Sequence, residues 1–147
     1  MSLISANNVI QITLKVGVVY KFDAPELINT TVPHYFIVVA IENENNYMVL
    51  CTTQLDSKQA YFAKKGYDFN TLAFILPTET NGLKVKTYVN CNDYHTISKE
   101  ELIKKVESKN FKLTGHLSRE EYDKIKFAID LSHVNDLPTF LLEYPEI

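Results

Sequence analysis

The pattern of apolar residues changes at Ser98, and this change constrains the possible fold more than any other feature. Upstream of Ser98, β-branched and aromatic residues gather in short runs bounded by polar turns, which is typical of strands. The expected strands are Val9–Val16, Val18–Phe22, Tyr35–Ile41, Tyr47–Thr52, Leu72–Leu76 and Val85–Val89. Two hairpins are expected among them, because Glu42–Asn46 is a polar turn and the Asn81-Gly82 pair accepts positive φ.

Downstream of Ser98, two segments have the sequence of a capped helix. Ser98-Lys99-Glu100-Glu101 and Ser118-Arg119-Glu120-Glu121 both have capping-box spacing, and apolar residues follow each at helical intervals. The second helix is expected to extend to His133. The sequence therefore predicts an α+β fold, in which a small twisted sheet or partly open β-barrel is followed by two short C-terminal helices.

The chain of 147 residues has the size of a single domain. We expect a barrel core over about residues 9–97, a helical part over about 98–134 and an apolar tail over 135–147. The segment Asp23–Pro33 contains two prolines and is expected to be a long loop between strands. The bulky apolar side chains of the tail need cover, either from the domain's own core or from a second copy in a homodimer.

The net charge and the spacing of the cysteines exclude some classes of protein and of binding site. The net charge of −3 argues against a protein that coats DNA by bulk charge, although a local basic groove is compatible with it. Cys51 and Cys91 belong to no CxxC or CxxH pattern, so we expect two reduced, buried thiols, with a bridge between adjacent strands as the alternative. No signal peptide or membrane-spanning run is recognisable, which favours a cytoplasmic protein without membrane partners.

Several catalytic and cofactor motifs are absent from the sequence. It contains no GxGxxG or GxxxxGK[ST] loop, no HExxH or paired Cys/His spacing, and no GxSxG elbow. We therefore expect neither a nucleotide cofactor nor a metal ion.

Histidine is the side chain best suited to proton transfer near neutral pH. His34 lies at the start of an expected strand beside a proline-rich loop, and His95 lies in a polar stretch before a capped helix. A catalytic role and an ordinary surface role are both open for these two. His116 and His133 are interpreted as structural, since His116 immediately precedes a helix cap and His133 lies at a helix C-terminus.

Hydroxyl, lysine and aromatic side chains supply candidate RNA-binding groups. Thr52 and Thr53 end an expected strand, where their hydroxyls can donate to a phosphate oxygen. The segment Ser57–Tyr67 interleaves lysines with aromatic residues, as single-stranded nucleic-acid platforms do. The same composition also suits a half-buried strand and loop. The candidate RNA-binding side chains of this segment are Lys58, Tyr61, Lys64 and Lys65.

The order of elements resembles the MazF/PemK-type toxins of toxin–antitoxin systems. The similarity is clearest over Lys86–Ser98, with Gly115-His116-Leu117-Ser118 similar to the lead into the family's closing helix. Val16–Tyr20 is similar to the family's opening strand, and Pro33 with Tyr35–Ala40 is similar to its proline-led strand. The resemblance covers roughly residues 15–134. It implies an SH3-like barrel, a metal-independent endoribonuclease acting on single-stranded RNA, a cognate antitoxin and a homodimer.

The chain departs from the family pattern at the position of its arginine. Val32 stands where the family has an arginine before the proline, and the loop Asp56–Thr71 is longer than usual. His34 and His95 fall at two family site positions, so they are candidates for the base and acid of 2′-hydroxyl attack, with Thr53 or a lysine on the non-bridging oxygens. The alternative is a noncatalytic barrel of the same shape that binds RNA or a protein partner.

Overall fold

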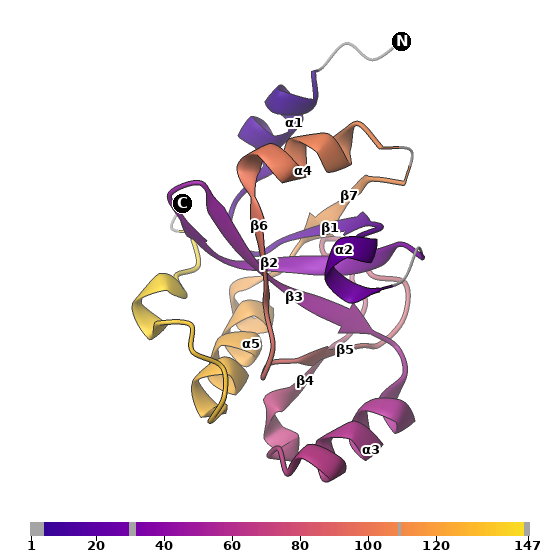
Figure 1. Cartoon of the computed structure of the whole chain (residues 1–147), viewed down its shortest axis with the longest axis vertical. Coiled ribbons are helices and arrows are strands. Elements are labelled where there is room, and N and C mark those ends of the chain that lie inside the picture. The colour runs from indigo at the N-terminus through magenta and orange to yellow at the C-terminus, as the bar shows by residue number, and fades with distance from the viewer. Residues whose placement is uncertain (1–4, 30–31, 109, 146–147) are drawn as a thin grey trace.

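The computed structural model describes residues 5–29, 32–108 and 110–145, and across these residues seven strands form one antiparallel sheet. Its order is β4-β5-β3-β2-β1-β7, and β6 also pairs with β3 (Figure 1). The sheet is not closed, because β4 and β7 remain at opposite ends of this order. The predicted α+β class with a partly open barrel is confirmed. The strands are β1 Val18–Phe22, β2 His34–Glu42, β3 Asn45–Thr52, β4 Leu72–Ile75, β5 Thr87–Asn90, β6 His95–Ser98 and β7 Lys112–His116.

Both predicted C-terminal helices are present, and both begin with a complete capping box. The hydroxyl of Ser98 accepts the N–H of Glu101, whose carboxylate accepts the N–H of Ser98. Ser118 and Glu121 repeat this arrangement. The second helix ends at Leu131 rather than at His133, because the backbone of Ser132 is extended. The described helices are α1 Ala6–Thr13, α2 Pro25–Ile28, α3 Leu55–Lys65, α4 Lys99–Val106 and α5 Arg119–Leu131, with 3-10 turns η1 Phe69–Thr71 and η2 Thr139–Leu141.

The predicted strand Val9–Val16 is wrong, because helix α1 occupies most of that segment. The hydroxyl of Ser5 caps the helix by accepting the N–H of Asn8 at 3.2 Å. Helix α1 packs against α4, and Ile10 is completely buried between the helices and the sheet. Tertiary packing of one apolar stripe therefore overrides the strand preference of the β-branched residues.

Two other segments contain helices that the sequence did not indicate. The expected loop Asp23–Pro33 contains the single turn α2, which starts with Pro25 in its first turn. The segment Ser57–Tyr67 is neither a strand nor a loop, since α3 runs from Leu55 to Lys65 and ends at Gly66 in the left-handed region. Strand β7 likewise lies within the part that was expected to be helical.

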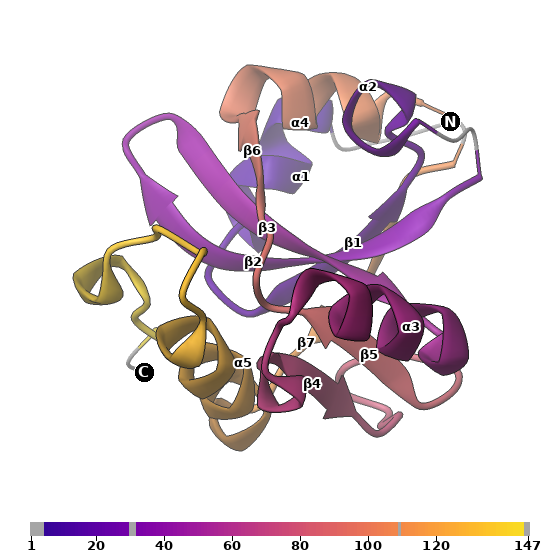
Figure 2. The ribbon, with the colours of Figure 1, turned by 60° about the horizontal axis from the view of Figure 1, so that its bottom comes forward.

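Alternating side chains divide the core into two clusters on opposite faces of the sheet. Ile37, Val39 and Val49 point to the face covered by α5. Phe36 and Met48 point to the other face, where α1 and α4 pack. Figure 2 shows these two helices on one side of the sheet and α5 with the C-terminal segment on the other. The period of two along each strand thus produces two cores from one sheet.

The described part of the apolar tail folds back on its own domain. Leu142 is completely buried, and the Tyr144 hydroxyl donates a 2.6 Å hydrogen bond to the carbonyl of Leu117. Within the described ranges, no helix is both long and apolar enough to cross a membrane.

Candidate functional site

The candidate site lies where β3 changes partners along one of its edges. Strand β6 pairs with residues Asn45–Met48 of β3, whereas β5 pairs with Cys51 and Thr52 at its end. His95 is the first residue of β6 and Thr52 is the last residue of β3. The turn between β5 and β6 therefore brings His95 beside the second half of β3.

His34, Thr52 and His95 share one face of the sheet. His34 is two residues from Phe36, Thr52 is two residues from Leu50, and His95 is two residues from Ile97. Phe36 and Ile97 belong to the core cluster under α1 and α4, and Leu50 packs against it. Because side chains two residues apart in a strand point to the same face, all three candidate residues lie on this side.

His95 lines a small, half-enclosed hollow of about 50 Å³. Its ring meets Phe36 edge-on, with 6.3 Å between the ring centroids. Burial lowers the pKa of His95, and the nearby carboxylate of Asp93 partly opposes this shift. The imidazole is therefore predominantly neutral at pH 7 and can accept a proton. The residues around the hollow are Leu50, Thr52, Lys58, Asn90, Asp93 and His95.

His34 lines a second hollow of about 230 Å³, large enough for a phosphate group. Its Nδ1 lies 2.7 Å from the carbonyl oxygen of Val32. Since a carbonyl can only accept, Nδ1 carries the proton of this hydrogen bond, and Nε2 is the ring nitrogen left to meet a ligand. The residues around this hollow are Lys21, Pro33, His34, Tyr35, Cys51, Thr52, Thr53, Gln54 and Thr87.

The two hollows adjoin at Thr52, which lines both of them. Its hydroxyl accepts the N–H of Gln54 at 3.2 Å and so is held at the strand end. Thr53 lines only the hollow of His34. Of the two threonines, Thr52 is therefore the one that both histidines can share through a bound group.

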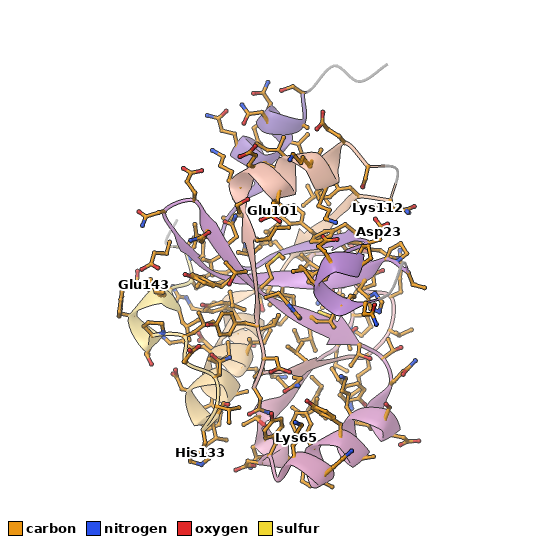
Figure 3. The ribbon with its side chains drawn as sticks, viewed as in Figure 1. Asp23, Lys65, Glu101, Lys112, His133 and Glu143 are labelled. Atoms are coloured by element: carbon orange, nitrogen blue, oxygen red, sulfur yellow. The ribbon has the colours of Figure 1, made fainter. Side chains whose placement is uncertain are left out.

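Helix α3 places part of the predicted lysine and tyrosine set beside the site. Lys58 lines the His95 hollow, and its ammonium lies 5.5 Å from the ring centroid of Tyr61. Lys65, labelled in Figure 3, lies 5.7 Å from the same ring. Because positions 58, 61 and 65 have helical spacing, they form one stripe on α3. Lys64 is exposed on the same helix and lines neither hollow.

The sequence did not single out Lys21, Tyr35 or Asp93 as site residues. Lys21 and Tyr35 are cross-strand neighbours of β1 and β2, and the ammonium lies 4.9 Å from the ring centroid. Their pairing depends on strand register, which no local motif specifies. Asp93 lies in the polar turn before His95, and that proximity was the available signal.

The other two histidines and Arg119 lie outside both hollows. His116 Nε2 lies 3.2 Å from the carbonyl oxygen of Val16, and its ring packs against Tyr144. His133 is exposed just beyond α5 (Figure 3). The guanidinium carbon of Arg119 lies 5.2 Å from the Tyr144 ring centroid, on the C-terminal segment. Arg119 is the single arginine of the sequence, so any phosphate chemistry at the two hollows proceeds without an arginine.

Both cysteines are free, buried thiols. Among the described residues, no group of three or more His, Cys, Asp or Glu side chains could hold a metal ion. The chain matches no known protein-family model and no curated protein.

Proposed function

We propose that the protein is a metal-independent endoribonuclease that cleaves single-stranded RNA by attack of a 2′-hydroxyl on the adjacent phosphate. The observation that carries this proposal is that His34 and His95 lie on one sheet face and that Thr52 lines the hollow beside each of them. The His34 hollow also extends around the strand ends to Tyr35 and Cys51 of the opposite face. Two imidazoles on either side of one hydroxyl supply a base, an acid and a hydrogen-bond donor for a phosphodiester.

The environments of the two histidines favour different roles. His95 is half-buried, and its lowered pKa keeps the ring neutral, so it accepts the proton of the 2′-hydroxyl. The 2′-oxygen then bonds to phosphorus while the bond from phosphorus to the 5′-oxygen breaks. Protonated His34, oriented through its Nδ1 by the Val32 carbonyl, donates its Nε2 proton to the departing 5′-oxygen. The products are a 2′,3′-cyclic phosphate and a 5′-hydroxyl.

Neutral and cationic donors around Thr52 stabilise the negative charge that develops on the phosphorane. The hydroxyls of Thr52 and Thr53 and the ammonium of Lys58 are available to the non-bridging oxygens. The hollow beside His95 is too small for a nucleotide, so the scissile phosphate and the attacking 2′-hydroxyl lie over its mouth, and the ribose that carries the departing 5′-oxygen occupies the larger hollow of His34.

A cleavage assay with matched histidine variants tests the proposal. The wild type, incubated with single-stranded RNA and EDTA, is expected to yield fragments ending in a 2′,3′-cyclic phosphate. His34→Asn and His95→Asn are each expected to reduce kcat/KM by about 10²-fold or more, as loss of a general acid or base does. His133→Asn removes an exposed histidine outside the site and serves as the control. The acid limb of the pH profile is expected below pH ~6.5 and is lost in His95→Asn.

RNA binding without cleavage is the second candidate function. It is favoured by Val32, which stands where the resembling family has an arginine, and by the position of Arg119 beside Tyr144. Binding of the RNA with no cleavage product would select this candidate, and no binding would contradict both. The antitoxin partner and the homodimer that the resemblance implies stay predictions.

A further inference from the structure

A row of side chains continues from the candidate site toward the edge of the sheet. Thr52 of β3 pairs directly with Tyr88 of β5, and Tyr88 pairs directly with Phe74 of β4. Directly paired residues of antiparallel strands point to the same face, with their Cβ atoms about 5 Å apart. Thr52, Tyr88 and Phe74 therefore form a continuous row, called here the aromatic row. It extends across two strand spacings, or roughly 10 Å.

The aromatic row is not part of either core cluster. The residues that alternate with it, Ala73, Ile75 and Val89, are buried on the opposite face against α5. Phe74 by contrast is 41% exposed, although it is a large apolar side chain on an edge strand. Tyr88 is half-buried, so neither ring of the row is completely covered by the protein.

The ammonium groups of two lysines lie over the rings of the aromatic row. The ammonium of Lys86 lies 4.3 Å from the ring centroid of Phe74 and 5.5 Å from that of Tyr88. The ammonium of Lys124 lies 4.8 Å from the Phe74 centroid. Phe74 and Lys124 also line the hollow between β4 and α5, together with the carboxylates of Glu120 and Asp123. The side of the row beside Lys86 and Tyr88 is therefore the one suited to a phosphate backbone.

We propose that the aromatic row is a second RNA subsite, on which bases next to the scissile phosphate stack. This inference rests on the proposed function, since it names the substrate surface that extends from the two hollows. Proteins hold single-stranded nucleic acid without reading its sequence by stacking its bases on aromatic rings and by placing ammonium groups beside its backbone. A duplex hides its base faces, so the row selects unpaired RNA.

Binding of an uncleavable oligonucleotide measures this subsite independently of catalysis. The probe is a fluorescent single-stranded DNA of about eight nucleotides, which lacks the attacking hydroxyl but keeps the base faces. Tyr88→Ala and Phe74→Ala are each expected to weaken its binding about tenfold in fluorescence anisotropy. Tyr88→Phe keeps the ring and is expected to bind as the wild type does. Lys86→Gln is expected to lower the slope of log Kd against log salt by about 0.7.

A comparison of substrate lengths separates this subsite from the hollows. With an RNA dinucleotide, which reaches only the two hollows, Tyr88→Ala and Phe74→Ala are expected to retain the wild-type kcat/KM. With an RNA of about eight nucleotides, their kcat/KM is expected to fall about tenfold. Phe140→Ala removes an exposed aromatic ring from η2, which packs against β2, and is the matched control. Thermal melting establishes that every variant is folded.

The possible failures are distinguishable. If the wild type binds the oligonucleotide and Tyr88→Ala and Phe74→Ala bind it equally well, the aromatic row is not a subsite. If the wild type binds and the variants weaken as expected but no RNA is cleaved, the row stands and the catalytic proposal fails. If the wild type does not bind the oligonucleotide at all, the aromatic row is not a subsite, and the RNA cleavage assay decides the catalytic proposal by itself.

Discussion

Asn81 donates a 2.8 Å hydrogen bond from Nδ2 to Oε2 of Glu121, joining the loop after β4 to the first turn of α5. The other carboxylate oxygen of Glu121 accepts the N–H of Ser118 in the capping box. Asn81 is completely buried, and its side-chain oxygen accepts the N–H groups of Thr78 and Leu83. A single pair of side chains therefore fixes both the loop and the helix start.

Asn81→Ala is expected to lower the free energy of unfolding by about 3 kcal/mol, because it leaves several buried polar groups without partners. Urea denaturation measures this change. A loss below about 0.5 kcal/mol would show that the loop is held by other contacts.

The two capping boxes form a matched pair for testing the tertiary bond of Glu121. Glu101→Ala removes only the local capping interaction and is expected to cost about 1 kcal/mol. Glu121→Ala also removes the bond to Asn81 and is expected to cost about 1 kcal/mol more. Denaturation curves of the two variants, measured together, give the difference. Equal losses would contradict a contribution from the Asn81 bond.

Gly115 is expected to tolerate no side chain, in contrast to Gly66. A Cβ atom at Gly115 would overlap the carbonyl groups of Thr80 and Asn81, which are backbone and cannot turn away. Gly115→Ala is therefore expected to cost about 3 kcal/mol or more. Gly66 has a φ of +72° with open space around it, so Gly66→Ala is expected to cost only about 1 kcal/mol. Thermal melting ranks the two, and the reverse order would contradict the close approach at Gly115.

Stability is expected to decrease as the pH falls from about 7 to about 5. Burial lowers the pKa of His95, and burial together with Lys15 lowers that of His116. The unfolded chain, with pKa values near 6.5, therefore binds more protons than the folded chain in this window, so the free energy of unfolding rises with pH. The variant with both His95→Gln and His116→Gln is expected to show a shallower pH dependence in urea titrations. His133→Gln controls for loss of an exposed histidine, and an unchanged slope in the double variant would contradict the linkage.

Both thiols are expected to resist alkylation in the folded protein. Burial raises the pKa of Cys91 to about 12, and burial with the neighbouring Cys91 raises that of Cys51. Only the thiolate reacts, so iodoacetamide at pH 8 is expected to modify the native chain at least 10²-fold more slowly, as an order of magnitude, than the urea-unfolded chain. Mass spectrometry follows the modification. Rapid labelling of either cysteine in the native protein would contradict its burial.

The sequence predicted best those elements whose signals are local. The two capping boxes predicted the correct starts of α4 and α5, and runs of apolar residues predicted the central strands β1, β2 and β3. Helix α1 was mistaken for a strand because its β-branched residues suit a sheet, whereas its burial depends on α4, which lies about ninety residues further along. Strands β6 and β7 were missed because they are short and have few apolar side chains.

The individual residues of the candidate site could be predicted from the sequence, but their arrangement in space could not. His34 and Thr52 were singled out from their places at strand ends, and His95 from its place in a polar stretch before a capped helix. Their common face depends on the register of β2 and β6 against β3, which is a property of long-range pairing. Tyr88 and Phe74 carried no separate signal, because only the pairing of β3, β5 and β4 aligns them with Thr52.

One edge of β1 pairs with β7, a strand that lies about ninety residues later in the chain. The paired residues are Val18–Lys21 of β1 and Lys112–His116 of β7. During synthesis on the ribosome, β1 and β2 emerge long before β7. The hydrogen-bonding groups along that edge of β1 therefore stay open to a neighbouring nascent chain until residue 116 has left the exit tunnel. This topology therefore leaves an unpaired strand edge during translation, although the same edge is covered in the finished fold.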